Sequence, residues 1–127
     1  MTTITRRAAL LGGISFASLG LTACISAPPM DEKEVNDAVS QVDGVTSTEI
    51  KVERSGTADW SLRGQIGLPD DPTQARTVYE NCLRAIAGVP SERNIGVSVS
   101  GVSASGDLDT GSVGAPDDTR RLKEHFS

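Results

Sequence analysis

The stretch DPTQARTVYENCLRAIAGVP, residues 71–90, decides the fold because it carries the complete signal of one helix. Asp71 is a good N-cap residue, and Pro72 suits the first helical position. Gly88 followed by Pro90 ends the pattern. Apolar side chains recur every three or four residues, at Ala75, Val78, Tyr79, Cys82, Leu83 and Ile86. This spacing predicts a helix that buries one face.

A shorter helical pattern lies upstream of this helix. Asp31 can cap it, and Glu34 completes a capping box three residues later. Apolar residues follow at helical spacing, at Val35, Ala38, Val39 and Val42. Gly44 ends the run, where a left-handed residue is favoured. The pattern predicts an amphipathic helix that ends near Asp43.

Three segments alternate between apolar and polar residues, which is typical of strands with one wet face. The inward-facing residues are Thr48, Ile50 and Val52, then Trp60, Leu62, Ile66 and Leu68, then Ile95, Val97 and Val99, with the last strand reaching Val102. Ser55-Gly56 marks a turn, so the first two strands should form a hairpin. Gly64 falls on the inward face, where a missing side chain lets another group pack closely.

These elements predict an α+β fold. The expected architecture is a two-layer α-β-β-α-β sandwich, with two helices on one face of a small three-stranded mixed sheet, because a right-handed crossover through the second helix places both helices together. The opposite face is left to solvent or a partner, and it carries Glu49, Lys51, Glu53, Arg63 and Gln65. We expect the domain to span 31–105. Residues 106–116 are rich in Gly, Asp and Ser and begin an expected mobile tail, 106–127. A short helix can form near its end, and whether this end docks on the domain stays open.

The first 23 residues indicate export. Arg6 and Arg7 precede an apolar run, 8–23, that is shorter than the roughly 20 residues of a membrane span. Leu21, Thr22, Ala23 and Cys24 then resemble the bacterial lipobox at every position. The resemblance implies that 1–23 are removed and that Cys24 is lipidated, which anchors the protein in the cell membrane, facing outside the cytoplasm. Residues 24–30 would serve as anchor and tether, with a reach of about 20 Å.

The export route stays open between two alternatives. Thr5-Arg6-Arg7-Ala8-Ala9-Leu10 also resembles the twin-arginine signal, whose cargo crosses the membrane already folded. A plain positively charged start of a general secretory signal fits the same residues. Neither route implies a cofactor.

The net charge of the mature chain limits the classes of partner that the domain can bind. The mature chain keeps all 17 acidic residues and 10 of the 12 basic residues, so its net charge is −7. An acidic domain is a poor partner for nucleic acid or anionic headgroups. Lipidation of Cys24 leaves Cys82 as the single thiol, and its place on the apolar helix face favours a small buried side chain over a reactive one.

Catalytic and metal-binding patterns are not recognisable in the sequence. His125 lies in a polar segment near the end, away from any nucleophile pattern. Asp107 and Asp109 resemble the start of a calcium loop whose further ligands are missing, and a solvated loop is favoured. We therefore expect no enzyme activity, no metal and no cofactor.

The order of elements also resembles the BON domain of bacterial envelope proteins. The resemblance covers about 31–102 and rests on Leu62-Arg63-Gly64-Gln65-Ile66 and Ala87-Gly88-Val89. It implies a non-catalytic module that makes contacts in the envelope, including contact with phospholipid. The function expected is a membrane-anchored binding or structural domain whose partner is an envelope protein, engaged through the polar sheet face or an open strand edge. The alternative is a small-ligand carrier or sensor, with its pocket between helices and sheet near Gly64 and Gly96.

Overall fold

The computed structural model describes residues 27–55 and 59–127. The elements are α3 (Glu32–Ser40), β1 (Ser47–Ser55), β2 (Asp59–Gly67), α4 (Pro72–Ala87), β3 (Gly96–Ser103), β4 (Gly106–Leu108), a 3-10 turn η2 (Gly111–Val113) and α5 (Thr119–His125). The export residues Arg6 and Arg7 and the lipobox residues Leu21, Thr22, Ala23 and Cys24 lie outside the described residues.

The strands form one mixed sheet in the order β1-β2-β3-β4. The predicted hairpin is confirmed, because β1 and β2 pair antiparallel, while β2 and β3 pair parallel through the α4 crossover. The predicted three-stranded sheet is wrong by one strand, since Gly106–Leu108 pairs antiparallel with the end of β3. Gly106 adopts φ +130°, which closes the tight β3–β4 turn.

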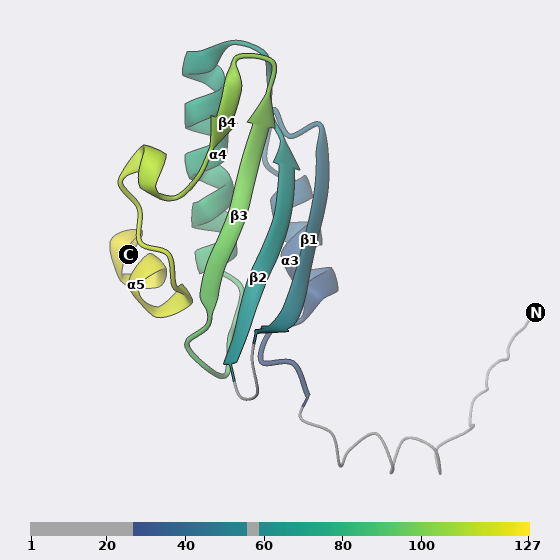
Figure 1. Cartoon of the computed structure of the whole chain (residues 1–127), viewed down its shortest axis with the longest axis vertical. Helices are drawn as coiled ribbons and strands as arrows, with labels where there is room; N and C mark the ends of the chain where they lie inside the picture. Colours follow the sequence, from purple (N-terminus) through teal and green to yellow (C-terminus); the bar gives the residue numbers. More distant parts are fainter. Residues whose placement is uncertain (1–26, 56–58) are drawn as a thin grey trace, which may run out of the picture.

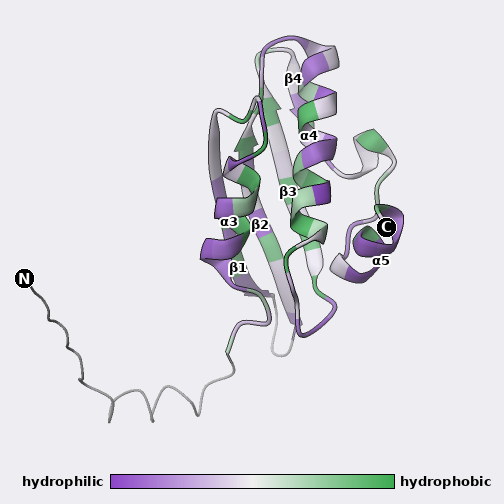
Figure 2. Ribbon diagram, turned by 180° about the vertical axis from the view of Figure 1, so that it is seen from behind, coloured by the Kyte–Doolittle hydropathy of each residue, from purple (hydrophilic) through white to green (hydrophobic). Residues whose placement is uncertain are grey.

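Helices α3 and α4 cover one face of the sheet, as expected (Figures 1 and 2). The Asp71 carboxylate caps α4 by accepting a 2.9 Å hydrogen bond from the Gln74 N–H, and Gly88 is the C-cap. Asp31 caps α3 by accepting from the Lys33 and Glu34 N–H groups. Helix α3 ends at Ser40 rather than near residue 43, and a turn containing Gly44 (φ +95°) leads into β1.

The core fills the space between these two layers. It is built from aliphatic side chains of α3, α4 and the inward faces of β1, β2 and β3, with Tyr79 as its one fully buried aromatic residue among those described. The Tyr79 hydroxyl donates a 2.7 Å hydrogen bond to the carbonyl of Val99, which ties α4 to β3. Trp60, predicted to face inward, packs at the margin of the core and stays half-buried.

The predicted mobile tail is instead a folded part of the domain, so the expected boundary at residue 105 is wrong. Leu122 of α5 is fully buried, and Val113 is also buried. The Thr119 N–H donates to the Ile95 carbonyl and the Val97 N–H to the Asp117 carbonyl, so 117–119 lie against the start of β3. The physical reason is that α4 and β3 leave apolar surface open, which α5 covers from the side (Figure 1).

Gly64 lies on the inward face of β2, opposite Ile50 of β1. It has φ +149°, and a Cβ atom there would collide with the carbonyl oxygen of Glu49 and lie 2.8 Å from the Ile50 Cα. The group that packs closely is therefore the β1 backbone itself, and this position requires glycine.

We expect Gly64→Ala to lower the free energy of unfolding by about 3 kcal/mol or more, because both the φ angle and the contact with β1 are incompatible with a side chain. Urea unfolding followed by circular dichroism measures this. Gly96→Ala is the matched control, since a Cβ there would lie 3.7 Å from the Ser61 Cβ, in ordinary contact. Equal losses in the two variants would contradict this account of the sheet.

Candidate functional site

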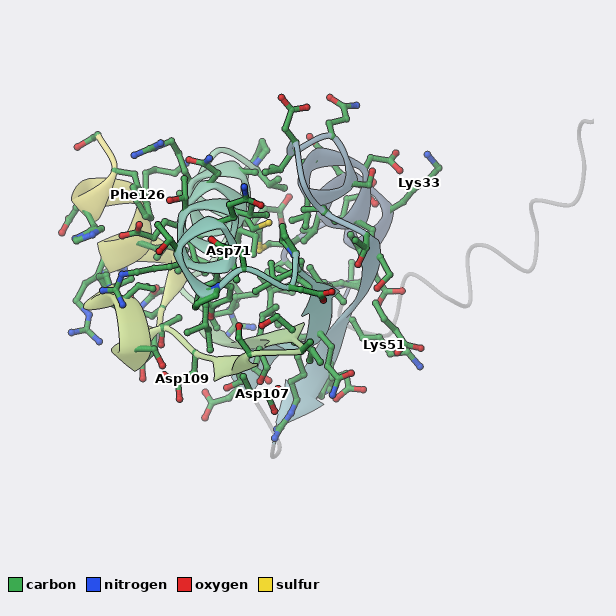
Figure 3. All side chains as sticks on the ribbon, turned by 90° about the horizontal axis from the view of Figure 1, so that it is seen from above. Lys33, Lys51, Asp71, Asp107, Asp109 and Phe126 are labelled. Carbon is green, nitrogen blue, oxygen red and sulfur yellow. The ribbon has the colours of Figure 1, made fainter. Side chains whose placement is uncertain are left out.

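The outer sheet face, defined as Glu49, Lys51, Glu53, Arg63, Gln65, Ser98 and Ser100, is the largest polar surface that the strands build together. The register places these side chains in rows across three strands: Glu49, Gln65 and Ser100 form one row. Lys51, Arg63 and Ser98 form the next. Figure 3 shows the sheet layer, with Lys51, on the opposite side of the molecule from the helices.

The outer sheet face carries both acidic and basic side chains, and these are available to a partner. The two carboxylates and two cations sum to zero, although the mature chain as a whole is strongly acidic. No ion pair or hydrogen bond joins the side chains of Glu49, Lys51, Glu53 and Arg63 within the described part of the chain. Because the serine side chains of β3 are small, the surface beside the charged side chains does not protrude. The outer sheet face is thus a polar surface rather than an apolar patch, and an open recess of about 380 Å³ borders it at Ser98 and Ser100.

The edge of β1 is closed by side chains of α3. The Asn36 amide donates a 2.8 Å hydrogen bond to the Ile50 carbonyl, and its oxygen accepts a 3.1 Å bond from the Ile50 N–H. The Glu32 carboxylate accepts a 2.9 Å bond from the Val52 N–H. These groups take the place of a neighbouring strand, so the middle of this edge is not open to a partner strand.

The edge of β3 is closed in two pieces. Its far half pairs with β4, and its near half bonds to 117–119. Docking by strand addition, one of the two modes expected from the sequence, is therefore disfavoured in the middle of β1 and at both ends of β3. The outer sheet face remains as the candidate docking surface.

Sequence reasoning missed Asn36 and Glu32 as edge-closing residues. The available signal was a polar residue, Asn36, directly after the buried Val35 in a helix with few apolar positions. Its partner lies 14 residues away, and no local spacing rule links the two.

A shallow recess lies beside the first residues of β2. It measures about 280 Å³ and is lined by Asp59, Trp60, Ser61, Arg93, Asn94, Ile95 and Gly96. Ser61 lies between the inward-facing residues Trp60 and Leu62, so strand alternation predicts that it points into solvent. It is only 7% exposed, and its hydroxyl has no hydrogen-bond partner among the described residues. The recess is open and lies below the usual size of a small-molecule site.

The internal pocket expected near Gly64 and Gly96 does not form among the described residues. The β1 backbone fills the space at Gly64, and Tyr79 is fully buried with its hydroxyl bonded. No recess in the described part of the chain is lined by both Trp60 and Tyr79. Among the recesses of the described residues, the open one beside Trp60 is the one that Gly96 lines.

Asp109 and His125, the other ionisable residues considered from the sequence, make local structural contacts. Asp109 accepts hydrogen bonds from the Ser112 N–H (2.8 Å) and hydroxyl (2.9 Å), which lower its pKa. His125 is exposed and packs its ring edge-on against Phe126. Residues 27–55 and 59–127 contain no cluster of three metal-ligating side chains. None of their helices is long and apolar enough to cross a bilayer.

Cys82 is fully buried, as the sequence predicts. Loss of hydration raises the pKa of its thiol from 9.0 to about 12. The buried thiol is therefore protonated and a poor nucleophile at neutral pH.

Comparison with known proteins identifies no relative. No family model matches the chain, and no curated protein or solved structure is significantly similar to it. Function is therefore argued from the surface alone.

We expect Asn36→Ala to lower the free energy of unfolding by about 1–3 kcal/mol, because the Ile50 N–H and carbonyl lose their partners. The freed edge should also promote concentration-dependent self-association, measured by analytical ultracentrifugation. Asn81→Ala is the matched control, since Asn81 bonds only the exposed Arg84 side chain. A variant that stays monomeric and as stable as this control would refute the role of Asn36.

We expect the stability of the domain to fall as the pH rises from about 9 to about 12. The folded-state pKa of Cys82 is raised, so its contribution is complete below the unfolded value and is lost as the pH passes through the folded value. The slope should be at most about 1.4 kcal/mol per pH unit from this thiol. Cys82→Ala should show a shallower decline in urea titrations at each pH, and an unchanged slope would contradict the assignment.

Proposed function

We propose that this protein is a lipid-anchored envelope protein whose α+β domain is a non-catalytic binding module. The lipid on Cys24 holds it on the cell membrane, facing outside the cytoplasm, and the outer sheet face engages an envelope protein. The observation that carries the proposal is this face itself: it is exposed and charge-balanced, with charged groups that no described neighbour pairs.

The chemistry of the face favours a polar protein partner. Protein interfaces that form and dissociate are about as polar as the rest of a protein surface, and charged rows give such contacts specificity and register. Alternating Glu49, Lys51 and Glu53 along β1 would meet a partner of alternating charge. Val102, 37% exposed, is the single large apolar side chain that the described surface leaves open, so an apolar partner has little to bind.

The element order supports the resemblance to BON domains. Helix α3, β1, β2, α4 and β3 follow one another as α-β-β-α-β, which is the order on which the resemblance rests. An adaptor role near a membrane agrees with a short tether and with polar surfaces. The small-ligand alternative rests on the recess beside Trp60, where the Ser61 hydroxyl has no partner within the described residues.

We expect a photo-crosslinking amino acid in place of Lys51 to capture an envelope protein in intact cells. The same amino acid in place of Lys33 is the matched control, because Lys33 is also exposed but extends from α3 in the helix layer (Figure 3). Adducts at 51 and not at 33, lost in Cys24→Ala cells that release the protein from the membrane, are the expected result. Mass spectrometry of the amino-terminal peptide should find a lipid on Cys24.

Two outcomes would overturn the proposal. An unmodified Cys24 in a chain that keeps residues 1–23 would refute the anchor. Equal capture at positions 33 and 51, or capture at neither, would refute the outer sheet face as the docking surface.

A further inference from the structure

The domain begins earlier in the chain than the sequence suggested. The Pro29 carbonyl accepts a 2.9 Å hydrogen bond from the Glu92 N–H, and Met30 is 3% exposed. Both residues were assigned to the tether, but they are attached to the body of the domain. The segment between Cys24 and the body is therefore 25–28, four residues long.

The length of this segment limits how far the attachment point can lie from a lipid at Cys24. Four residues and their link to Pro29 span at most about 15–18 Å when fully extended. Strand β2, with nine residues, is about 30 Å long. The tether is thus shorter than the domain, which restricts the orientations of the domain relative to the bilayer.

The attachment point defines a near end of the domain, made of Pro29, Arg54, Asp59, Trp60, Glu92 and Arg93. Glu92 lies in the α4–β3 connection, and the recess lined by Trp60 includes Arg93 of the same connection. Arg54, opposite Trp60 in the β1–β2 register, places its guanidinium 5.6 Å from the Trp60 ring. Figure 1 shows the first described residues, the start of β2 and the α4–β3 connection at one end of the molecule.

The connections at the opposite, far end carry acidic residues and no basic ones. These are the α3–β1, β2–α4 and β3–β4 connections, which contain Asp43, Asp70 and Asp71 and no lysine or arginine. Asp107, paired with Val102 in the adjoining β4, adds a fourth carboxylate. Figure 3, viewed from this end, shows Asp71 and Asp107 over α4 and the sheet.

The near end, in contrast, carries charges of both signs, among them Arg54, Asp59, Glu92 and Arg93. The acidic residues Asp31, Glu32 and Glu34 at the start of α3 line a recess together with Glu92. The basic residues Arg120 and Lys123 of α5 line another recess together with Arg93.

These charges favour one orientation at an anionic membrane. The surface potential of such a membrane acts within about a Debye length, roughly 8 Å at physiological salt. Carboxylates at the far end would be repelled within this distance, whereas at the near end basic residues such as Arg54 and Arg93 would offset the repulsion of the carboxylates around them. Trp60, half-buried beside an arginine, is suited to the polar headgroup layer.

We propose that the near end faces the bilayer, in contact with its lipid headgroups around Trp60, and that the far end points away from the membrane. This inference rests on the proposed lipid anchor at Cys24. In this orientation the outer sheet face is roughly perpendicular to the membrane surface. A partner can then approach the face from the side.

The test uses the single tryptophan of the chain as its probe. The full chain is produced in a lipidating bacterium, and the lipidated form is reconstituted in vesicles of phosphatidylcholine and phosphatidylglycerol. Some of these lipids carry a nitroxide quencher on the headgroup. We expect Trp60 to lose fluorescence relative to vesicles without the quencher.

Two variants serve as controls. In the first, Trp60→Phe is combined with Ala104→Trp, which moves the probe to the exposed β3–β4 turn at the far end. We expect this probe to be spared. In the second, ten glycine and serine residues inserted after Ala27 lengthen the tether, and quenching of Trp60 should weaken while membrane attachment is kept.

The outcomes separate this proposal from the proposed function. Quenching of Trp60 that is no stronger than that of the far-end probe, in a sample whose Cys24 lipid is verified by mass spectrometry, overturns the orientation and leaves the anchor intact. A missing lipid overturns the anchor. In that case the chain is coupled through Cys24 to a maleimide phospholipid, which the buried Cys82 thiol does not compete for, and the orientation is measured in the same way.

Discussion

The burial of one face of α4 against β2 and β3 is the interaction on which the rest of the structure depends. Among the described elements, this helix supplies more buried apolar side chains to the core than any other, including Tyr79, whose hydroxyl donates a hydrogen bond to the Val99 carbonyl. Close packing is allowed by Gly101, where a Cβ atom would lie 2.5 Å from Leu68 Cδ1 and 2.8 Å from Tyr79 Cδ1. A core with so few aromatic residues depends on such close contacts for its density.

Covering one face of the sheet with helices leaves the other face and the edges as the surfaces on which function can lie. The edges are closed by different means: side chains of α3 along β1, and pieces of the C-terminal segment along β3. Unprotected edges invite pairing with other chains. The proposed docking surface therefore relies on side chains, and Glu49, Lys51 and Arg63 are charged residues of the outer sheet face.

The point where the chain enters the fold and the acidic connections define one axis of the domain. The chain enters the fold at Pro29, bonded to Glu92, and the carboxylate-only connections lie at the opposite end. A membrane anchor near one end and acidic groups at the other would both favour the same orientation. The outer sheet face runs between these ends, so a partner could reach it without displacing the domain from the membrane.

The sequence by itself determined both helices that cover the sheet, the hairpin and the strand after the crossover, because helical and strand periodicities are local properties of the chain. The fold class followed from their order. The role of Cys24 stays a prediction, as it lies outside the described residues. The tertiary structure decided the fourth strand and the docking of α5. Gly106–Leu108 is too short to carry a periodic signal, and Leu122 is buried only because α4 and β3 leave apolar surface beside it. It also decided that Asn36 closes an edge and that Ser61 is buried, since both depend on residues distant in the chain.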